Sequence, residues 1–112
     1  MWVKATVGSI VMLANSGAFA GHLTYSQWAA LDDGRRAVYM AGVIDRLANL
    51  VPATASSKQG MHYQRCVLEG EMTSGQLSDN VLTFARSFPE VQKLSARAAL
   101  IQYLNRLCGI LP

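Results

Sequence analysis

The sequence has few of the residues that carry catalytic chemistry. Its 112 residues include only two histidines, and neither G-x-S-x-G nor H-E-x-x-H occurs anywhere in the chain. These patterns position the nucleophile or the metal ligands of common hydrolases, so their absence argues against those enzyme classes. We therefore expect no catalytic residue, no bound metal, no cofactor and no enzyme activity.

Charged residues are also scarce. Asp, Glu, Lys and Arg together make up 15% of the chain, and no run of basic residues is longer than the pair Arg35 and Arg36. The net charge is +3, and it falls to +2 without the first 20 residues, which contain Lys4 and no acid. Nucleic-acid binding needs many clustered phosphate contacts, so we expect no nucleic-acid partner.

Hydrophobic residues make up 51% of the chain, which is enough for one folded domain. Residues 1–20 differ from the rest: Lys4 precedes an apolar run over residues 7–13, and the triplet A-F-A ends at Ala20. This order of features is typical of a secretory signal peptide. We expect cleavage after Ala20, a mature domain over residues 21–112, a periplasmic location and no membrane contact after cleavage.

An uncleaved membrane anchor is the alternative for this N-terminal segment. Its apolar run is shorter than the roughly 20 residues that a helix needs to cross a bilayer. Export is therefore the favoured interpretation.

Two T-x-x-Q patterns mark expected helix starts. In each, a threonine side chain and a glutamine side chain three residues later can satisfy each other's free backbone amide. The first pair is Thr24 and Gln27, which predicts a short helix over residues 25–31. The second pair is Thr73 and Gln76, which begins the clearest helical pattern in the chain.

Apolar residues at helical spacing predict three longer helices. One begins with Asp32 or Asp33 as N-cap and stops by Leu50 or Val51, because Pro52 cannot continue the hydrogen-bond ladder. The apolar stripes are Met40, Val43, Ile44, Leu47 and Val51; Leu77, Val81, Phe84 and Phe88; and Leu100, Tyr103, Leu104 and Leu107.

Breaker residues predict where the chain turns between these helices. Pro89 ends the helix that follows Thr73, Ser95 begins the last helix, and Gly109 is well placed just after its end. The small, polar stretch 52–60 predicts an exposed loop, and residues 61–72 fit either a short helix or an extended segment. No stretch alternates with period two, so we expect an all-α fold, a small bundle of four to five helices.

The two cysteines, Cys66 and Cys108, are 42 positions apart. In an exported protein a single pair is expected to form a disulfide, which would stabilise the fold by roughly 4 kcal/mol. Two alternatives are weaker. A reactive thiolate at Cys108 would oppose the dipole at a helix C-terminus, and a zinc site with His22 and His62 would lack paired short spacings.

Two residues within the first long apolar pattern need an explanation. Asp45 lies beside the apolar stripe, and we expect it to pair with an arginine or to cap a neighbouring backbone. Gly42 costs a helix about 1 kcal/mol relative to alanine, and a close contact with a second helix would compensate.

The order of these features resembles the small exported Rap/Tai domain family over roughly Trp28 to Cys108. The stretches that carry the resemblance are "YMAGVIDRL", a cysteine, "TSGQLSDNVLTFARSFPE" and a cysteine near the end. Family members commonly end in a Pro-Cys pair, whereas Leu107 precedes Cys108 here. The matching positions are Tyr39, Gly42, Asp45, Cys66, Thr73, Leu77, Val81, Pro89, Glu90, Leu104 and Cys108.

The resemblance implies an all-helical periplasmic domain that binds a partner protein, either as a monomer or as a homodimer. Family members include immunity proteins that neutralise cell-wall amidase effectors of type VI secretion. Because a polar segment with cations and an aromatic residue has the composition of an interface, we expect Lys58, His62, Tyr63 and Arg65 to bind the partner. For Tyr63, packing in the core is an equal alternative.

A second function remains open from the sequence. A periplasmic stress or chaperone-like helical protein would also be small, exported and linked by one disulfide. It would use exposed apolar surface, for which Trp28 and Leu31 are the candidates.

Overall fold

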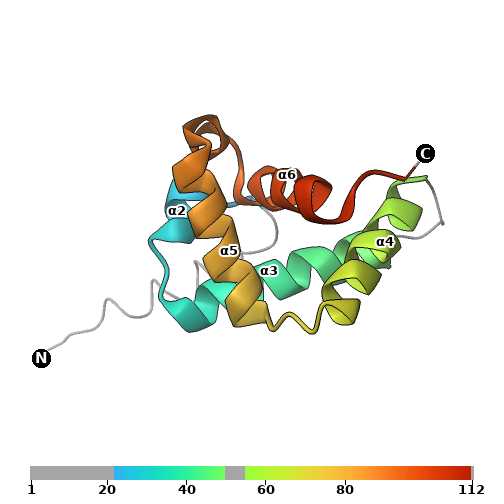
Figure 1. Cartoon of the computed structure of the whole chain (residues 1–112). Coiled ribbons are helices and arrows are strands. Elements are labelled where there is room, and N and C mark those ends of the chain that lie inside the picture. The colour runs from blue at the N-terminus through green and yellow to red at the C-terminus, as the bar shows by residue number, and fades with distance from the viewer. Residues whose placement is uncertain (1–21, 50–54, 112) are drawn as a thin grey trace, which may run out of the picture.

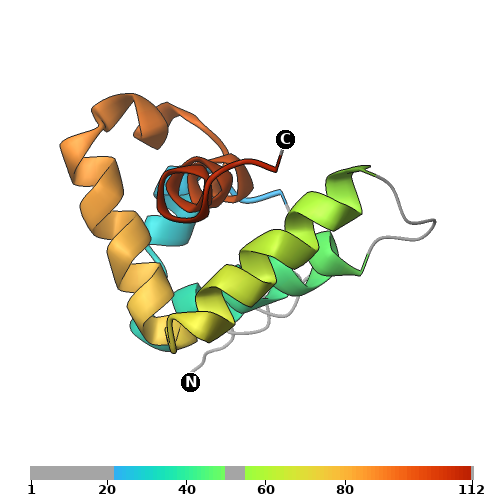
Figure 2. The ribbon, with the colours of Figure 1, turned by 45° about the vertical axis from the view of Figure 1, so that its right-hand side comes forward.

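The computed structural model describes residues 22–49 and 55–111. This part of the chain is all-α, as the sequence predicts, and the expected signal peptide over residues 1–20 lies outside it. Figure 2 shows α4 and α5 diverging from a shared end, with α6 viewed nearly end-on in the opening between them. The elements are α2 (Tyr25–Ala29), α3 (Asp33–Ala48), α4 (Ala55–Glu69), α5 (Ser74–Ser87), the short 3₁₀ helix η1 (Pro89–Lys93) and α6 (Ala96–Cys108); Figure 1 labels the five α-helices.

Both predicted capping boxes are present. At the start of α2, the Gln27 amide donates to Thr24 Oγ1 over 3.1 Å, and the Thr24 amide donates to Gln27 Oε1 over 2.9 Å. The same reciprocal pair forms between Thr73 and Gln76 at the start of α5. Each box satisfies two backbone amides that a helix start leaves without partners.

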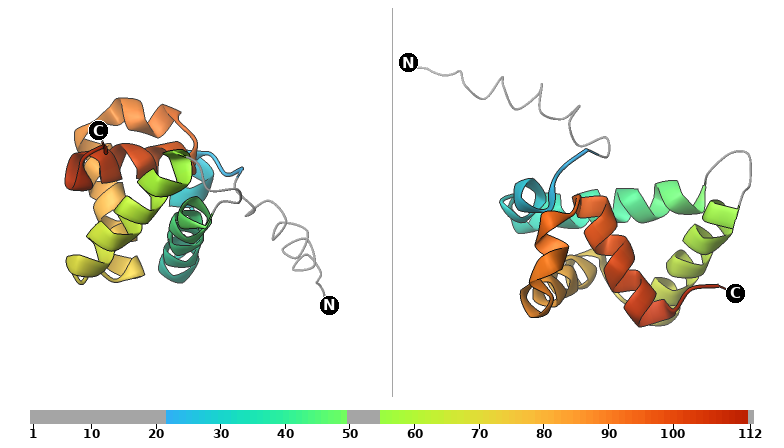
Figure 3. Two further views of the ribbon diagram at one scale, coloured as in Figure 1. Left: turned by 90° about the vertical axis from the view of Figure 1, so that its right-hand side faces the viewer. Right: turned by 90° about the horizontal axis from the view of Figure 1, so that it is seen from above.

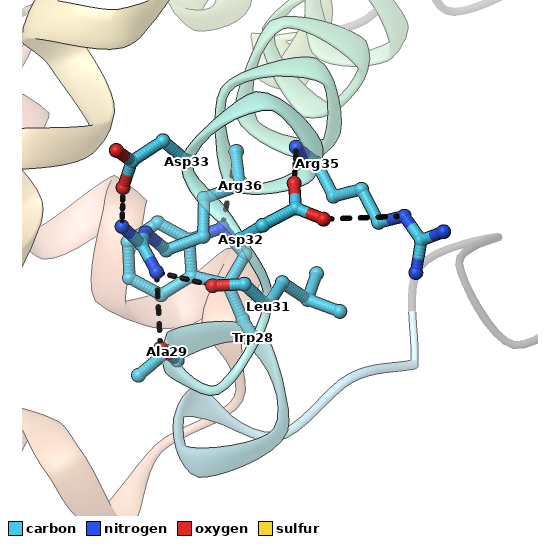
Figure 4. Close-up of polar contacts among 7 residues, drawn as sticks. All are labelled: Trp28, Ala29, Leu31, Asp32, Asp33, Arg35 and Arg36. Atoms are coloured by element: carbon cyan, nitrogen blue, oxygen red, sulfur yellow. Dashed lines mark hydrogen bonds and ion pairs between the residues drawn. The ribbon is translucent and has the colours of Figure 1, made fainter.

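The N-cap of α3 is Asp32, which decides between the two candidates that the sequence left open. Its Oδ1 accepts a hydrogen bond of 2.8 Å from the amide of Arg35, and its other carboxylate oxygen lies 3.6 Å from the Arg35 side chain (Figure 4). Asp33 is the first residue of the helix, where a negative charge favours the helix dipole.

Arg36 holds the short helix α2 against α3 (Figure 4). Its guanidinium donates hydrogen bonds to the backbone carbonyls of Ala29 and Leu31, while its own carbonyl accepts from Trp28 Nε1 over 3.1 Å. The carbonyls at the end of α2 thus receive a side-chain donor. This junction also explains why α2 ends at Ala29, two residues earlier than predicted.

The predicted loop over residues 52–60 is wrong from residue 55 onward, because α4 begins at Ala55 and continues through the ambiguous stretch to Glu69. The small residues that resembled a loop are packing positions. Ser57 is buried, and a Cβ atom on Gly60 would lie 2.2 Å from the carbonyl oxygen of Leu47 in α3. Only a residue without a side chain lets the two helix backbones approach so closely.

The close helix contact expected at Gly42 is therefore at Gly60 instead. A Cβ atom on Gly42 would meet no described atom within 4 Å, and this glycine is exposed. The helix that carries it ends at Ala48 with Asn49 as C-cap, and the expected endpoint at Leu50 or Val51 lies outside the described residues.

Among the described residues of the predicted stripes, Phe84 and Tyr103 are half-buried, two others are exposed, and the rest are buried. Phe88 and Leu107, which the spacing assigned to buried stripes, are exposed by 39% and 46%. Both lie at the C-terminal end of their helix, beyond the neighbours that cover the rest of the stripe. The largest fully buried hydrophobic side chains are Trp28, Met40, Leu77, Val81, Leu100 and Leu104.

The predicted disulfide is present and joins two helices. The sulfur atoms of Cys66 and Cys108 are 2.04 Å apart and their Cα atoms are 5.9 Å apart. Cys66 lies within α4 rather than in an irregular segment, and Cys108 is the last residue of α6. Gly109 then ends α6 with φ of 79°, a conformation that glycine adopts without strain, as predicted.

Candidate partner-binding surfaces

The four residues predicted to bind a partner all lie on α4, but they have different surroundings. Lys58 and Arg65 are exposed, and His62 is half-buried. Tyr63 is 4% exposed and belongs to the core, where its hydroxyl donates to Asn105 Oδ1 of α6. Tyr63 therefore packs in the core, and the partner-binding role of this set stays a prediction.

His62 contacts the end of α6. Its Nε2 lies 2.9 Å from the carbonyl oxygen of Cys108. Since a carbonyl oxygen can only accept, Nε2 is the protonated nitrogen in this contact. His62 therefore supplies a hydrogen bond beside the disulfide, to one of the carbonyls that a helix end leaves without a partner.

The C-terminal tail is held by the same helix. Figure 3 shows it running from the end of α6 toward α4. Gln59 Oε1 accepts a hydrogen bond of 2.8 Å from the amide of Leu111, and Gln59 Nε2 donates to the carbonyl of Gly109 over 3.3 Å. One side of α4 thus binds α6 and the tail, which leaves the opposite side for other contacts.

The exposed side of α4 mixes cations and apolar residues. Lys58, Met61, Arg65 and Leu68 recur at helical spacing, and the apolar members are well exposed, Leu68 by 68%. Leu68 also lines a hollow of about 160 Å³ between α4 and the neighbouring parts of α3 and α5, together with Ile44. If Lys58 and Arg65 bind a partner protein, as the sequence predicts, this is the surface that the partner would contact.

A second surface lies where α5 meets α6 and combines aromatic rings with an arginine. The ring centroids of Phe84 and Phe88 are 5.0 Å apart, and those of Phe84 and Tyr103 are 5.7 Å apart. The guanidinium carbon of Arg106 lies 4.2 Å from the centroid of the Phe88 ring. The exposed Leu107 follows Arg106 on the same helix. We call these five residues the Phe88–Arg106 surface.

Sequence reasoning missed this second surface. Phe84, Phe88, Tyr103 and Leu107 fit helical stripes, and a stripe predicts burial. The one available signal was position, because Phe88 precedes Pro89 and Leu107 precedes the end of the last helix. The ends of a stripe are the places where packing neighbours run out.

The outer face of α3 is a further candidate. It has a hollow lined by Val38, Tyr39 and Gly42 between two arginines, Arg35 and Arg46. Val38 is 72% exposed, and the buried Tyr39 hydroxyl has no hydrogen-bond partner within residues 22–49 and 55–111. The middle of this face is apolar, and its lining is not specific for one class of ligand.

The remaining candidate residues have structural surroundings. Asp45 is exposed and accepts a hydrogen bond of 3.1 Å from Asn49 Nδ2 at the end of α3, so its pairing is with the helix C-cap rather than with an arginine. Both cysteines are consumed in the disulfide, so neither is available as a nucleophile or a zinc ligand. Within the described ranges, no group of three or more His, Cys, Asp or Glu residues is arranged to hold a metal ion.

Tyr25 is a buried tyrosine whose acidity depends on its surroundings. Burial raises the pKa of its phenol above the ordinary value of 10.0, and the positive charges of Arg86 and Arg36 partly oppose that rise. Because Tyr25 packs against Trp28 with ring centroids 5.7 Å apart, we assign it to the core and not to a site.

The apolar surface expected for a chaperone-like protein is not at the predicted position. Trp28 is completely buried, because it fills the core beneath the α2–α3 junction. Leu31 is half-buried. The expectation of an exposed Trp28 is wrong. A tryptophan whose indole nitrogen finds a backbone acceptor can be buried at no polar cost.

No helix in the part of the chain that the structure describes is both long and apolar enough to cross a membrane. No family model matches this chain, and neither a curated protein nor a solved structure matches it. The resemblance to the Rap/Tai family therefore stays a prediction from the sequence.

Proposed function

We propose that this chain is an exported helical protein that binds a partner protein, of the immunity type that inhibits a periplasmic cell-wall amidase effector. The observation that carries the proposal is the disulfide between Cys66 and Cys108 in a chain whose first 20 residues have a secretory pattern. Disulfides persist in oxidising compartments, so the bond and the export pattern support the same location.

Rigidity supports a binding role. The disulfide fixes α4 to α6, and two hydrogen bonds reinforce the same contact, one from His62 to the Cys108 carbonyl and one from Tyr63 to Asn105. A surface that is already ordered loses little conformational entropy when it binds. Inhibition of an enzyme by a small protein depends on such a preformed surface.

Binding is favoured over catalysis by the roles of the reactive side chains. Cys66 and Cys108 are bonded to each other, and His62 donates to a backbone carbonyl. The chain has one other histidine, His22, and lacks the hydrolase motifs sought in the sequence. The two cysteines and His62 therefore have structural roles that need no substrate.

Co-expression tests this function. The full chain would be produced together with periplasm-directed cell-wall amidases, beginning with any that is encoded beside its gene. Protection from lysis and a complex on size exclusion are expected for the cognate amidase. The matched control lacks residues 2–20 and should not protect, because the folded domain then stays in a different compartment from the enzyme.

Two results would remove the proposal. One is the absence of both protection and complex formation with every amidase tested. The other is broad suppression of aggregation of unrelated unfolded proteins, which is the behaviour of a chaperone-like protein and not of a specific inhibitor.

A further inference from the structure

The Phe88–Arg106 surface has the composition of a binding hot spot. Aromatic residues and arginine are enriched where protein interfaces gain most of their affinity. Here three aromatic rings contact one another in a series, Tyr103 to Phe84 to Phe88, and Arg106 lies over the last ring. Asn80 fixes the far end of the series by donating to the Tyr103 hydroxyl over 3.1 Å. The rings are thus positioned before any partner arrives.

The Phe88–Arg106 surface contains two exposed apolar side chains, Phe88 and Leu107, and two more follow in the tail that lies against α4. Leu107 lies one helical turn from Tyr103, and the tail that follows carries Ile110 and Leu111, exposed by 69% and 40%. Together with Phe88, these residues are four of the seven large hydrophobic side chains that the structure leaves exposed within the described ranges. Of these four, Phe88 and Leu107 belong to the Phe88–Arg106 surface, and exposed apolar side chains beside an arginine are typical of an interaction site.

The positive charge of Arg106 indicates which group the partner would present to this surface. The ion pairs among the described residues join Arg35 to Asp32, Arg36 to Asp33 and Lys93 to Glu90, and Arg106 is in none of them. Its contact with Phe88 uses the face of the ring and leaves the guanidinium N–H groups able to donate. A carboxylate is the acceptor that matches this fork of donors.

We propose that the Phe88–Arg106 surface docks a protein segment in which an apolar side chain lies next to an aspartate or glutamate. The apolar group would contact Phe88 and Leu107 while the carboxylate pairs with Arg106. A glycan is the less suitable occupant, because Arg106 already covers one face of the Phe88 ring on which a sugar would stack. The inference deepens the proposed binding function and rests on it, but it places the contact on α5 and α6 rather than at Lys58 and Arg65.

Peptide selection tests the inference without an identified partner. The oxidised domain would be screened against a phage-displayed library of random peptides, and the affinities of the selected peptides would be measured as synthetic peptides. We expect the selected sequences to pair Asp or Glu with an aliphatic or aromatic residue. The R106Q variant should bind them about tenfold more weakly, and replacing the acidic residue of the peptide by its amide should weaken binding to the native protein similarly.

Control variants separate this surface from the others. R97Q removes an exposed arginine from the first turn of the same helix and should change affinity by less than about twofold. The double variant K58Q/R65Q removes the cations of α4 and should have an equally small effect. Unchanged Tm values for these variants and for R106Q would show that all of them fold.

Several outcomes would overturn the proposal. They are selected peptides without acidic residues, equal affinity of R106Q and the native protein, or loss of binding in K58Q/R65Q alone. A concentration-dependent dimer that R106Q abolishes would assign the surface to a second copy of the chain. Binding of muropeptides that F88L removes would assign it to a glycan. Because the selection uses no amidase, its failure and a failure to protect from lysis are separate results.

Discussion

Gly60 of α4 lies directly against the backbone of Leu47 in α3, so close that a Cβ atom on Gly60 would meet the Leu47 carbonyl oxygen at 2.2 Å and the carbonyl carbon at 2.3 Å. Backbone atoms cannot swing aside as a flexible side chain can. G60A should therefore separate the two helices and lower the free energy of unfolding by about 1–3 kcal/mol, even though alanine favours a helix. Urea unfolding monitored by circular dichroism measures the change.

Gly42 provides the matched control for that substitution. It also lies inside a helix, but a Cβ atom there would meet no described atom within 4 Å. G42A should raise the free energy of unfolding by roughly 0.5–1 kcal/mol, because alanine loses less backbone entropy than glycine on helix formation. Equal effects of G60A and G42A would contradict the assignment of the close contact.

The disulfide should account for a large share of the stability. Cys66 and Cys108 are 42 positions apart, and closing a loop of that length restricts the unfolded chain. The double variant C66S/C108S should lose roughly 3–4 kcal/mol of unfolding free energy. The native protein should lose a similar amount when a reductant is added, and the variant should not respond to it. Equal denaturation midpoints with and without reductant in the native protein would refute this.

The capping box at the start of α5 should contribute measurably. T73A removes the side chain that accepts from the Gln76 amide over 3.1 Å and should cost about 1 kcal/mol. Thr83 is exposed on the same helix, and its hydroxyl accepts only from Arg86 among the described contacts. T83A should therefore change stability by less than about 0.5 kcal/mol. Because alanine favours a helix more than threonine does, a cost as large as that of T73A would contradict the assignment of the T73A effect to the lost cap.

Stability should decline in alkaline solution because of Tyr25. Its pKa is raised in the folded protein, mainly by burial, while the unfolded phenol ionises near its ordinary value of 10.0. The unfolded state therefore loses its proton first, so the stabilisation is complete below about pH 10 and is lost as the pH rises through the folded pKa. Y25F should reduce the fall in Tm between about pH 8 and pH 11. An identical fall in both proteins would show that other groups cause it.

The sequence predicted the helices whose signals are local. Each of the two capping boxes joins residues three positions apart, and an N-cap at Asp32 or Asp33 and a helix end before Gly109 depend on the adjacent turn alone. The disulfide was predictable for a different reason, because the chain has only two cysteines and a secretory pattern. None of these inferences needed a distant part of the chain.

The start of α4 was not predictable in the same way. Serines and a glycine are common in loops, and their use in a helix depends on a second helix that approaches closely enough to require small residues. Gly60 meets that requirement because α3 lies beside it, whereas Gly42 has an open surface. A glycine inside a helix therefore marks a close helix contact at position 60 and no contact at position 42.

The candidate site also has some features that the sequence predicts and others that only the tertiary structure shows. The sequence by itself determined the two capping boxes, the apolar stripes and the single possible disulfide, since these depend on spacing and on residue counts. The tertiary structure alone decided that Tyr63 and Trp28 are buried and that Phe88 and Leu107 are exposed. Periodicity specifies which residues share a helix face. The burial of that face depends on which distant helices pack against it and on how much of its length they cover.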